Sequence, residues 1–358
     1  MVGKQGSSAR RREEPSGGPG VQVGEGSRGR LRQLLSPDSE LRKSSWQAPP
    51  QGFQAIAEES QLPKRVVERD HLFLVPNFEL AEALIRRGAD SARVAVRQGM
   101  DAEEWIQALA ESLPGDPLIP PRPFRFPWRS LVILPTYNER ENLEQMTQAI
   151  FRYLDTDILV VDDNSPDGTG EIADGLAAAN PRIRVLHRTK KEGLGKAYLA
   201  GFRLALEEDY ERIFETDCDF SHAPWDLPRL MAASEEADLV IGSRYVRGGS
   251  TEGWALPRVM LSKSANLYTR FWLGFGVHDW TAGFRCYHAS LLKKLDFDAI
   301  AANGYSFQIE MTWRTLRLGA KVRELPTRFV DRNLGKSKMN KKIALEAIRI
   351  VPWLRLRG

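Results

Sequence analysis

Short apolar segments alternate with helical patterns in the middle of the chain, and this alternation constrains the fold more than any other feature. The apolar segments are residues 130–135, 157–161, 183–187 and 212–216. Continuous apolar strands separated by helices predict a mostly parallel sheet that is covered by helices on both faces. We therefore expect an α/β fold that binds its ligands beyond the carboxyl ends of the strands.

Acidic side chains gather at those carboxyl ends. Glu139 follows the first strand, Asp162 and Asp163 end the second, and Asp217 and Asp219 follow the fourth. Two carboxylates separated by one residue can point the same way from a strand end. Such a pair suits a hard divalent cation, Mg²⁺ or Mn²⁺, with coordination positions left for phosphate oxygens. An Asp-x-Asp segment alone is weak evidence, because a solvated turn has the same composition. The other acidic strand ends favour metal and nucleotide binding.

Composition divides the rest of the chain. Residues 1–50 are rich in Gly, Ser, Arg and Pro, which predicts a disordered basic tail. Strand and helix patterns in residues 51–113 predict a small α/β appendage, and proline-rich residues 114–127 predict a stiff linker. The main, catalytic domain is expected over residues 128–340, and an amphipathic helix over residues 341–358.

Charge and cysteine content indicate which binding partners and which cellular compartment to expect. A net charge of +4 argues for no particular partner, and no interleaved aromatic-basic pattern supports nucleic-acid binding. Cys218 and Cys286 fit no metal-ligand spacing and favour a reducing compartment. The sequence has no apolar run of about 18 residues and no signal-peptide core, so we expect no membrane span. A cytoplasmic protein, peripheral on the cytosolic face of a membrane, is the expectation.

Motifs in the main domain resemble a known family. Its first half is similar to the GT-A inverting glycosyltransferases of family 2, through residues 135–139, 161–169, 193–197 and 217–219. Its second half narrows the resemblance to polyprenol-phosphate (dolichol-phosphate) mannose synthases, through residues 242–245, 253–254, 258, 262–263, 279–285, 304–311, 329–332 and 335–338. The sequence differs slightly from the usual family pattern at Cys218, Trp280 and Ala282. We do not expect these differences to alter the reaction. Within the appendage, residues 75–101 resemble a small piece of the two-Rossmann-domain glycosyltransferases, without their donor-binding residues.

The resemblance implies the reaction and its donor side. Mannose would pass with inversion from GDP-mannose to the phosphate of a polyprenyl (dolichyl) phosphate, giving a β-linked product. Asp217 and Asp219 would hold the metal against the donor diphosphate. The residues expected to bind the nucleotide sugar are Pro135, Tyr137, Glu139, Asp162, Asp163, Lys196 and Asp217. An alternative for Asp162 and Asp163 is a turn cap with Asn164 and Ser165.

The acceptor phosphate is already anionic near neutral pH, because its second pKa is about 6. It needs charge pairing and positioning more than a strong general base. The resemblance assigns Arg244 and Arg258 to this phosphate. Arg332 and Lys338 lie on an expected Gly-containing loop that would close over either the donor or the acceptor phosphates, and we expect Ser337 and Lys338 to contact the acceptor phosphate. Guanidinium groups bind phosphate in a bidentate manner, although a surface ion pair is the alternative for each arginine. The expected catalytic residues are Asp219, Arg244, Arg258 and Arg332.

A lipid acceptor requires a route from the membrane. Residues 257–273 predict an amphipathic helix, and cations and Trp beside a broad apolar face suit an interfacial helix. The expected apolar side comprises Met260, Leu261, Ala265, Leu267, Tyr268, Phe271 and Trp272. Packing against the domain is the alternative for this helix and for the tail helix. The chain would dock on the lipid surface or on a separate membrane subunit.

Two other functions stay open. The same chemistry with another donor, such as UDP-glucose, would depend on a few pocket residues that the pattern does not identify. A non-catalytic lipid- or nucleotide-binding homologue would not need the Asp and Arg residues above. A processive polysaccharide synthase is disfavoured, because the Gln-x-x-Arg-Trp pattern is absent.

Overall fold

The computed structural model describes residues 53–55, 72–75, 78–86, 89, 94–96, 122–302, 304–331 and 341–357. The expected tail over residues 1–50 and most of the predicted appendage and linker lie outside these ranges. So do three expected site residues, Arg332, Ser337 and Lys338.

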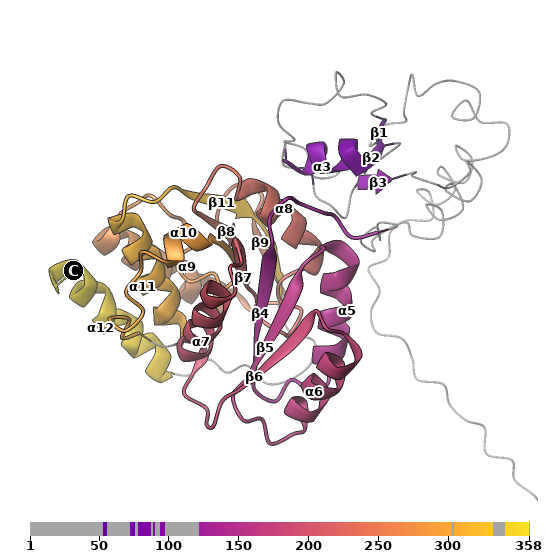
Figure 1. The fold of residues 1–358 in the computed structure, drawn as a ribbon. Coiled ribbons are helices and arrows are strands. Elements are labelled where there is room, and N and C mark those ends of the chain that lie inside the picture. Colours follow the sequence, from indigo (N-terminus) through magenta and orange to yellow (C-terminus); the bar gives the residue numbers. More distant parts are fainter. Residues whose placement is uncertain are drawn as a thin grey trace, which may run out of the picture.

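A seven-stranded sheet forms the centre of the molecule (Figure 1). Its order is β11-β8-β10-β7-β4-β5-β6, and among these strands only β10 runs antiparallel to its neighbours. The strands are β4 (Ser130–Thr136), β5 (Asp157–Asp162), β6 (Ile183–His187), β7 (Arg212–Glu215), β8 (Leu239–Ser243), β10 (Arg285–His288) and β11 (Val322–Pro326). The predicted α/β fold with a mostly parallel sheet is confirmed.

Helices cover both faces of this sheet because successive strand residues point to opposite sides. Leu131 and Ile133 of β4 pack in one core with α7 (Leu194–Glu207), α10 (Ala289–Leu292) and α11 (Gly304–Arg317). Val132 and Leu134 pack in the other core with α5 (Leu143–Tyr153), α6 (Thr169–Ala179) and α8 (Leu227–Ala233). The remaining elements are η3 (Pro224–Asp226), α9 (Leu256–Leu273), α12 (Lys341–Arg357) and the parallel pair β9 (Ser250–Glu252) and β12 (Arg328–Val330).

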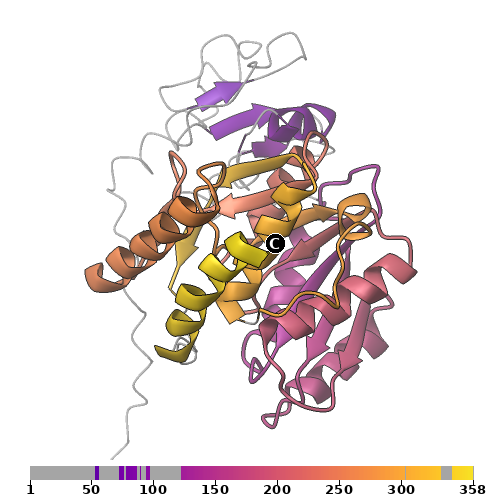
Figure 2. The same ribbon diagram turned by 90° about the vertical axis from the view of Figure 1, so that its left-hand side faces the viewer.

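The helices α9 and α12 lie side by side (Figure 2). The hydroxyl of Tyr268 on α9 donates a hydrogen bond to the carbonyl oxygen of Ile348 on α12, at 3.1 Å. Val351 and Leu354 of α12 are buried in the same core as α7 and α11. The tail helix therefore packs on the domain through one side, as the alternative in the sequence analysis proposed.

The described residues of the appendage form a small parallel sheet and a helix. These elements are β1 (Phe53–Ala55), β2 (Leu72–Val75), β3 (Val94–Val96) and α3 (Phe78–Arg86). Leu84 and Phe124 pack in one hydrophobic cluster with Ala232 of α8. The Nε atom of Arg86 lies 3.7 Å from Oε2 of Glu235. Phe124 exchanges backbone hydrogen bonds with residues 153 and 155. The described end of the expected linker is thus packed onto the catalytic domain.

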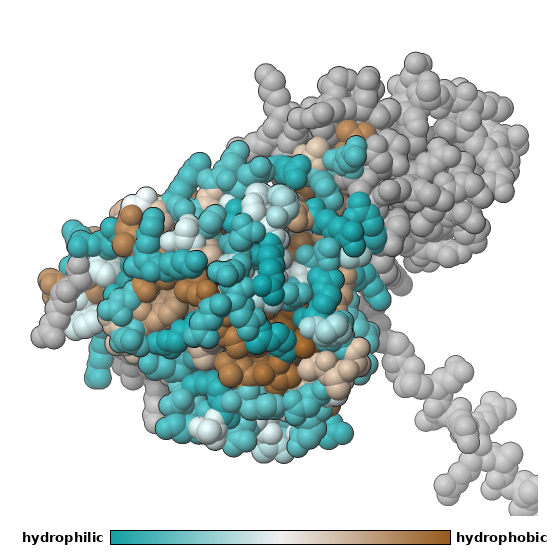
Figure 3. Space-filling view, in the orientation of Figure 1, coloured by the Kyte–Doolittle hydropathy of each residue, from teal (hydrophilic) through white to brown (hydrophobic). Residues whose placement is uncertain are grey.

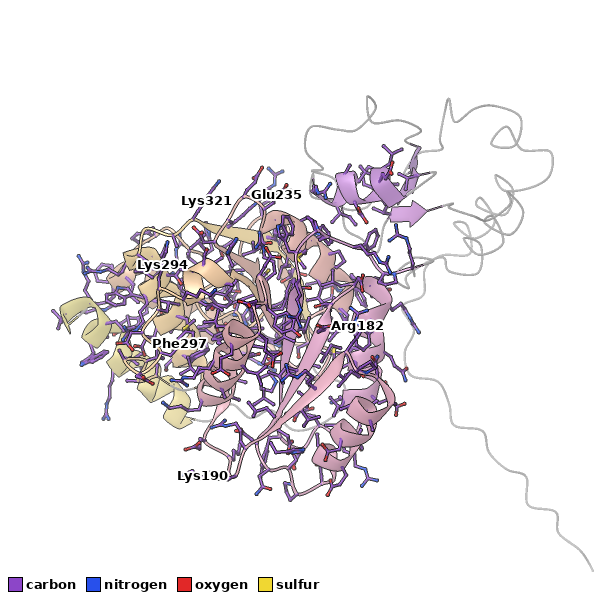
Figure 4. The ribbon with its side chains drawn as sticks, in the orientation of Figure 1. Arg182, Lys190, Glu235, Lys294, Phe297 and Lys321 are labelled. Carbon is purple, nitrogen blue, oxygen red and sulfur yellow. The ribbon has the colours of Figure 1, made fainter. Side chains whose placement is uncertain are left out.

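The appendage lies at the end of the sheet opposite the carboxyl ends of the parallel strands. Figure 4 labels Lys190, in the loop after β6, at one end and Glu235 and Lys321 at the other. Glu235 is the partner of Arg86 on α3. Among the described helices, none is long and apolar enough to cross a bilayer.

Candidate active site

The loops after β4 and β5 are tied together by hydrogen bonds. The backbone N–H of Asn138 donates to the Ser165 hydroxyl at 3.1 Å, and the N–H of Glu139 donates to Thr169 Oγ1 at 3.0 Å. Asn138 and Asn164 both adopt positive φ angles, 58° and 57°, a conformation that Asn tolerates better than most residues. These two loops therefore form one rigid rim at the carboxyl ends of the strands.

Asp162 and Asp163 play different parts in this rim. Asp162 accepts hydrogen bonds from Thr136 Oγ1, Ser165 N and Ser165 Oγ, which are the contacts of the turn-cap alternative. Asp163 Oδ1 accepts from Arg188 Nη1 at 2.6 Å. Burial raises the pKa of Asp163, and Arg188 opposes that shift. Nucleoside contact by either carboxylate stays a prediction.

The other expected donor-side residues line the same rim. The Lys191 ammonium group lies 3.6 Å from the centroid of the Tyr137 ring. The buried Glu139 carboxylate accepts from Asn142 Nδ2 at 2.9 Å, at the start of α5. Pro135 is half-buried near the end of β4, and Lys196 is exposed in the first turn of α7.

Asp217 and Asp219 follow β7 as predicted. Asp219 is buried and accepts from the backbone N–H of Ser221 at 3.0 Å, whereas Asp217 is half-buried. A Cβ atom added to Gly283 would lie 4.0 Å from Asp217 Oδ2 and 3.8 Å from Gln308 Nε2. Asp217 and the Gln308 amide therefore both lie beside the backbone of Gly283.

The residues around Gly283 fit a hard cation. Both polar atoms of the Gln308 side chain are buried, and the amide lies close enough to the Glu215 carboxylate to oppose the rise that burial causes in its pKa. The Gln amide has a carbonyl oxygen with two lone pairs, which can serve as a metal ligand. Two carboxylates and one amide oxygen are ligands that Mg²⁺ and Mn²⁺ accept. The described part of the chain has no cluster of three or more His, Cys, Asp or Glu side chains suited to a metal, so this mixed set is the candidate.

A buried polar group lies beneath the acid pair, and the sequence analysis did not identify it. The Tyr198 hydroxyl has no hydrogen-bond partner in the described part of the chain, and the Glu215 carboxylate lies near the Gln308 amide. Burial raises the pKa of Glu215 to about 7, although the Arg285 guanidinium, 4.0 Å away, opposes that shift. Arg285 is itself fully buried and donates to the carbonyl oxygens of Ala282 and Gln308. It thereby ties β10 to the start of α11.

Arg244 directly follows β8 and forms a buried bidentate pair with Asp279. Its Nε and Nη2 atoms donate to the two Asp279 oxygens at 2.7 and 2.6 Å, and Nη2 also donates to Thr281 Oγ1 at 2.7 Å. Burial acts to raise the pKa of Asp279, but Arg244 holds it below its ordinary value. The alternative reading of a surface ion pair is wrong for Arg244, because both partners are buried.

Arg258, in the first turn of α9, lies near the same place. Its Nη1 atom donates to Asp331 Oδ2 at 2.8 Å, and its guanidinium carbon lies 4.1 Å from the ring centroid of Trp254. Asp331 immediately precedes, in the sequence, the residues that include the remaining expected phosphate ligands. The Arg244 guanidinium carbon lies 5.7 Å from the Trp254 centroid, so Arg244 and Arg258, which are 14 positions apart in the sequence, both face this ring.

His222 is buried between the acid pair and Arg244. Its ring stacks on Phe284, with centroids 5.0 Å apart, and meets the edge of Phe329 at 5.0 Å. Its Nδ1 atom has no hydrogen-bond partner among the described residues. Burial lowers the pKa of His222 to about 4, so the imidazole is neutral at pH 7.

This shift predicts acid lability. The folded-state pKa of His222 lies below its unfolded value of 6.5, so the unfolded chain binds the extra proton as pH falls from 6.5 to about 4. The His222 contribution should therefore be complete above pH 6.5 and lost toward pH 4, at about 1.4 kcal/mol per pKa unit, or roughly 3 kcal/mol. Urea unfolding of the chelator-treated protein at pH 7.5, 6 and 5, compared with His222→Gln, measures it. Equal pH dependence in both proteins would contradict the assignment.

The helix α9 exposes only part of its expected apolar side, because Tyr268 and Trp272 pack against the core, whereas Lys263 of the expected polar side is exposed. Asn266 is buried, and its Oδ1 atom accepts from the Trp280 backbone N–H at 2.8 Å. Met260, Leu267 and Phe271 are 60%, 60% and 74% exposed. The predicted helix is confirmed, and its apolar residues are divided between the core and the surface.

Exposed apolar side chains concentrate on α9 and α12. In the orientation of Figure 1 the described surface is mostly hydrophilic, with local apolar patches (Figure 3). The exposed large apolar residues on α9, just after it and on α12 are Leu256, Met260, Leu261, Leu267, Phe271, Phe275, Ile348, Trp353 and Leu356. Leu318 is the other such residue in the described part of the chain.

The fold and the acid pair define a glycosyltransferase of the GT-A type. Residues 131–296 match the model of Glycosyl transferase family 2. The polyprenol monophosphomannose synthase of Mycolicibacterium smegmatis is 51% identical over 229 residues, covering 63% of this chain and 86% of that protein. The undecaprenyl-phosphate mannosyltransferase of Micrococcus luteus is 51% identical over 228 residues, covering 63% and 93%. The chain belongs to glycosyltransferase family 2.

Two solved structures have lower sequence identity to this chain and TM-scores below 0.5. Glucosyl-3-phosphoglycerate synthase from Mycobacterium tuberculosis, in complex with Mn²⁺ and UDP, is 20% identical, with a TM-score of 0.45 over 63% of this chain and 78% of that one. A mannosyltransferase from Pyrobaculum calidifontis, in complex with GDP-Man and Mn²⁺, is 18% identical, with a TM-score of 0.40 over 60% of each chain.

Proposed function

We propose that this protein transfers mannose from GDP-mannose to the phosphate of a polyprenyl phosphate, with inversion at the anomeric carbon. One observation carries the proposal. Asp217 and Asp219 could bind a metal and the donor diphosphate, and Arg244 and Arg258, each held by a carboxylate, could bind the acceptor phosphate. The two relatives with 51% identity, named for mannose transfer to polyprenyl phosphates, support the same reaction.

The donor would lie on the rim formed by the loops after β4 and β5. Tyr137 and Glu139 lie on that rim with Asp163 and would contact the nucleoside, and Lys196 would approach the diphosphate from α7. Asp217, Asp219 and Gln308 would hold Mg²⁺ or Mn²⁺. That ion, when bound, would neutralise the charge that develops on the leaving diphosphate.

The acceptor phosphate would lie against Arg244 and Arg258. An oxygen of the phosphate dianion attacks the anomeric carbon of mannose and forms the new carbon–oxygen bond. The bond from that carbon to the β-phosphate oxygen of GDP breaks, and GDP leaves with the electron pair. The nucleophile needs no deprotonation, because the second pKa of a phosphate monoester is about 6. The arginines therefore contribute by positioning and by charge stabilisation.

The exposed apolar residues of α9 would dock on the membrane that holds the acceptor. Arg258 lies on this helix, so docking would bring the phosphate ligand to the lipid surface. An interfacial helix with cations beside an apolar face binds lipid surfaces peripherally. We place the enzyme on the cytosolic face of the membrane, with a membrane protein subunit as the other docking partner to test.

The double substitution Leu267→Asp with Phe271→Asp should reduce binding to vesicles that contain anionic lipid by at least about 100-fold. Each side chain is worth about 1.5–3 kcal/mol when buried in an apolar environment. Co-sedimentation with vesicles measures this change, and Leu318→Asp, which alters an exposed leucine elsewhere, is the control. Unchanged binding of the double variant would assign docking to another surface.

Transfer of radiolabelled sugar to a short polyprenyl phosphate tests the function. The protein is first treated with a chelator and then assayed with and without Mg²⁺ or Mn²⁺, using GDP-mannose and UDP-glucose in parallel. We expect metal-dependent transfer from GDP-mannose alone. Transfer from UDP-glucose alone would keep the acceptor and change the donor, and no transfer, without and with a membrane fraction, would favour a non-catalytic binder.

A further inference from the structure

Trp254 is held firmly beside the two candidate phosphate ligands. It follows β9 and Gly253, whose φ angle is 76° and whose added Cβ would lie 3.1 Å from the Asp331 Cβ atom. The Trp254 ring meets the ring of Phe329 in β12 edge-on, with centroids 5.2 Å apart. Because β9 and β12 pair in register, with Thr251 opposite Phe329, the backbone fixes where this ring lies.

Two guanidinium groups approach the same indole ring. The guanidinium carbon of Arg258 lies 4.1 Å from the Trp254 centroid, and that of Arg244 lies 5.7 Å from it. Like charges repel, and each arginine is balanced by its own carboxylate from a different segment, Asp279 or Asp331. A tryptophan face attracts cations within about 6 Å of its centroid. The ring therefore provides an attraction that both arginines share.

Trp254 brings a hydrogen-bond donor to this place that has no acceptor among the described residues. This donor, Nε1 of the indole, is buried. A buried N–H without an acceptor is unfavourable, so such groups commonly bind a ligand or an ordered water. Within the same described residues, Arg258 donates one hydrogen bond, from Nη1 to Asp331. Both groups would gain from an oxygen-rich anion.

The location favours the lipid phosphate over the donor diphosphate. Trp254 lies two residues before α9, the helix with the exposed apolar residues. A phosphate attached to a lipid that lies along α9 would reach the protein at this end of the helix. The acid pair expected to face the donor instead follows β7.

We propose that Trp254 binds and positions the acceptor phosphate, an inference that rests on the proposed function. Its ring holds Arg244 and Arg258 in place for one phosphate monoester, and its indole N–H donates to an oxygen of that phosphate. The sequence analysis placed Trp254 in a family motif without assigning it a role.

Two substitutions separate the ring from the N–H. Trp254→Phe keeps an aromatic face and removes the donor, whereas Trp254→Leu removes both. We expect kcat/KM for a short polyprenyl phosphate to fall about 5- to 10-fold in the first and about 100-fold in the second, in line with one lost hydrogen bond and a lost cation–π contact. The KM for GDP-mannose should stay unchanged in both. Direct binding of the polyprenyl phosphate, measured by calorimetry without donor, should weaken in the same order.

Trp128→Leu is the matched control. Arg212 lies 4.4 Å from the Trp128 centroid, so this variant loses the same kind of contact before the amino end of β4. Its acceptor binding should equal that of the wild type. Wild-type acceptor binding by Trp254→Leu, or an equal loss of GDP-mannose affinity, would overturn the inference while the proposed function stands. A wild-type protein that neither binds nor mannosylates the lipid phosphate would overturn both.

Discussion

Asp219→Asn should reduce mannose transfer by at least about 10³-fold, equivalent to about 4 kcal/mol of transition-state stabilisation. The amide keeps the size of the side chain and can still accept the Ser221 N–H, so the turn after β7 should survive. It removes the negative charge that would hold the cation against the leaving diphosphate. Single-turnover assays of mannose transfer at saturating GDP-mannose measure this loss of rate. The assays are run at several Mg²⁺ concentrations between about 1 and 10 mM.

A matched control lies at the opposite end of the sheet. Asp238 also accepts a backbone N–H, from Lys321 at 2.8 Å, and Asp238→Asn should keep wild-type activity. Unfolding curves of both variants should resemble that of the wild type. An Asp219→Asn protein with more than about one tenth of wild-type activity would exclude the metal assignment, because a lost metal ligand costs more than that.

Arg244→Ala should combine a loss of acceptor use with a loss of stability. Asp279 is fully buried, and removal of its bidentate partner leaves an uncompensated charge, at a cost of about 3–5 kcal/mol. The KM for polyprenyl phosphate should rise by at least about 100-fold, as expected when a charged phosphate contact is lost. GDP affinity, measured by calorimetry below the unfolding temperature, should stay near the wild-type value.

Arg229→Ala separates the two effects. Arg229 forms a comparable buried pair with Asp226, so its removal should destabilise the protein to a similar degree without changing the KM for the acceptor. If both variants changed this KM equally, the effect of Arg244 would be a consequence of instability. If Arg244→Ala weakened GDP binding as much as acceptor use, Arg244 would belong to the donor side.

The strands and the acid pair were predictable because both depend on local sequence. Continuous apolar segments locate β4 to β7, and the parallel arrangement then places every following turn at one edge of the sheet. The antiparallel strand β10 was not predicted, because the prediction relied on strands that alternate with helices, and this pattern implies parallel strands. Its direction matters, because it brings residues 279–285 to the same edge as the acid pair.

The partners of the site residues were not predictable, because they come from distant segments. Gln308 lies 91 positions after Asp217 in the sequence, and both side chains come within about 4 Å of the position of a Cβ atom at Gly283. Arg244 and Asp279 are 35 positions apart. Asp162 illustrates the reverse case, since the short-range cap with Ser165 was recognisable as an alternative and the structure contains it.

Membrane docking through the exposed apolar residues of α9, as proposed above, would change how the enzyme kinetics depend on the acceptor. An enzyme that rests on a bilayer encounters its acceptor by diffusion in two dimensions, so its acceptor KM is a surface mole fraction and not a bulk molarity. Diluting the lipid acceptor with inert lipid should then slow the reaction, whereas adding vesicles of constant composition should not once all enzyme is bound. The rate in a cell would follow the composition of the membrane more closely than the total amount of acceptor.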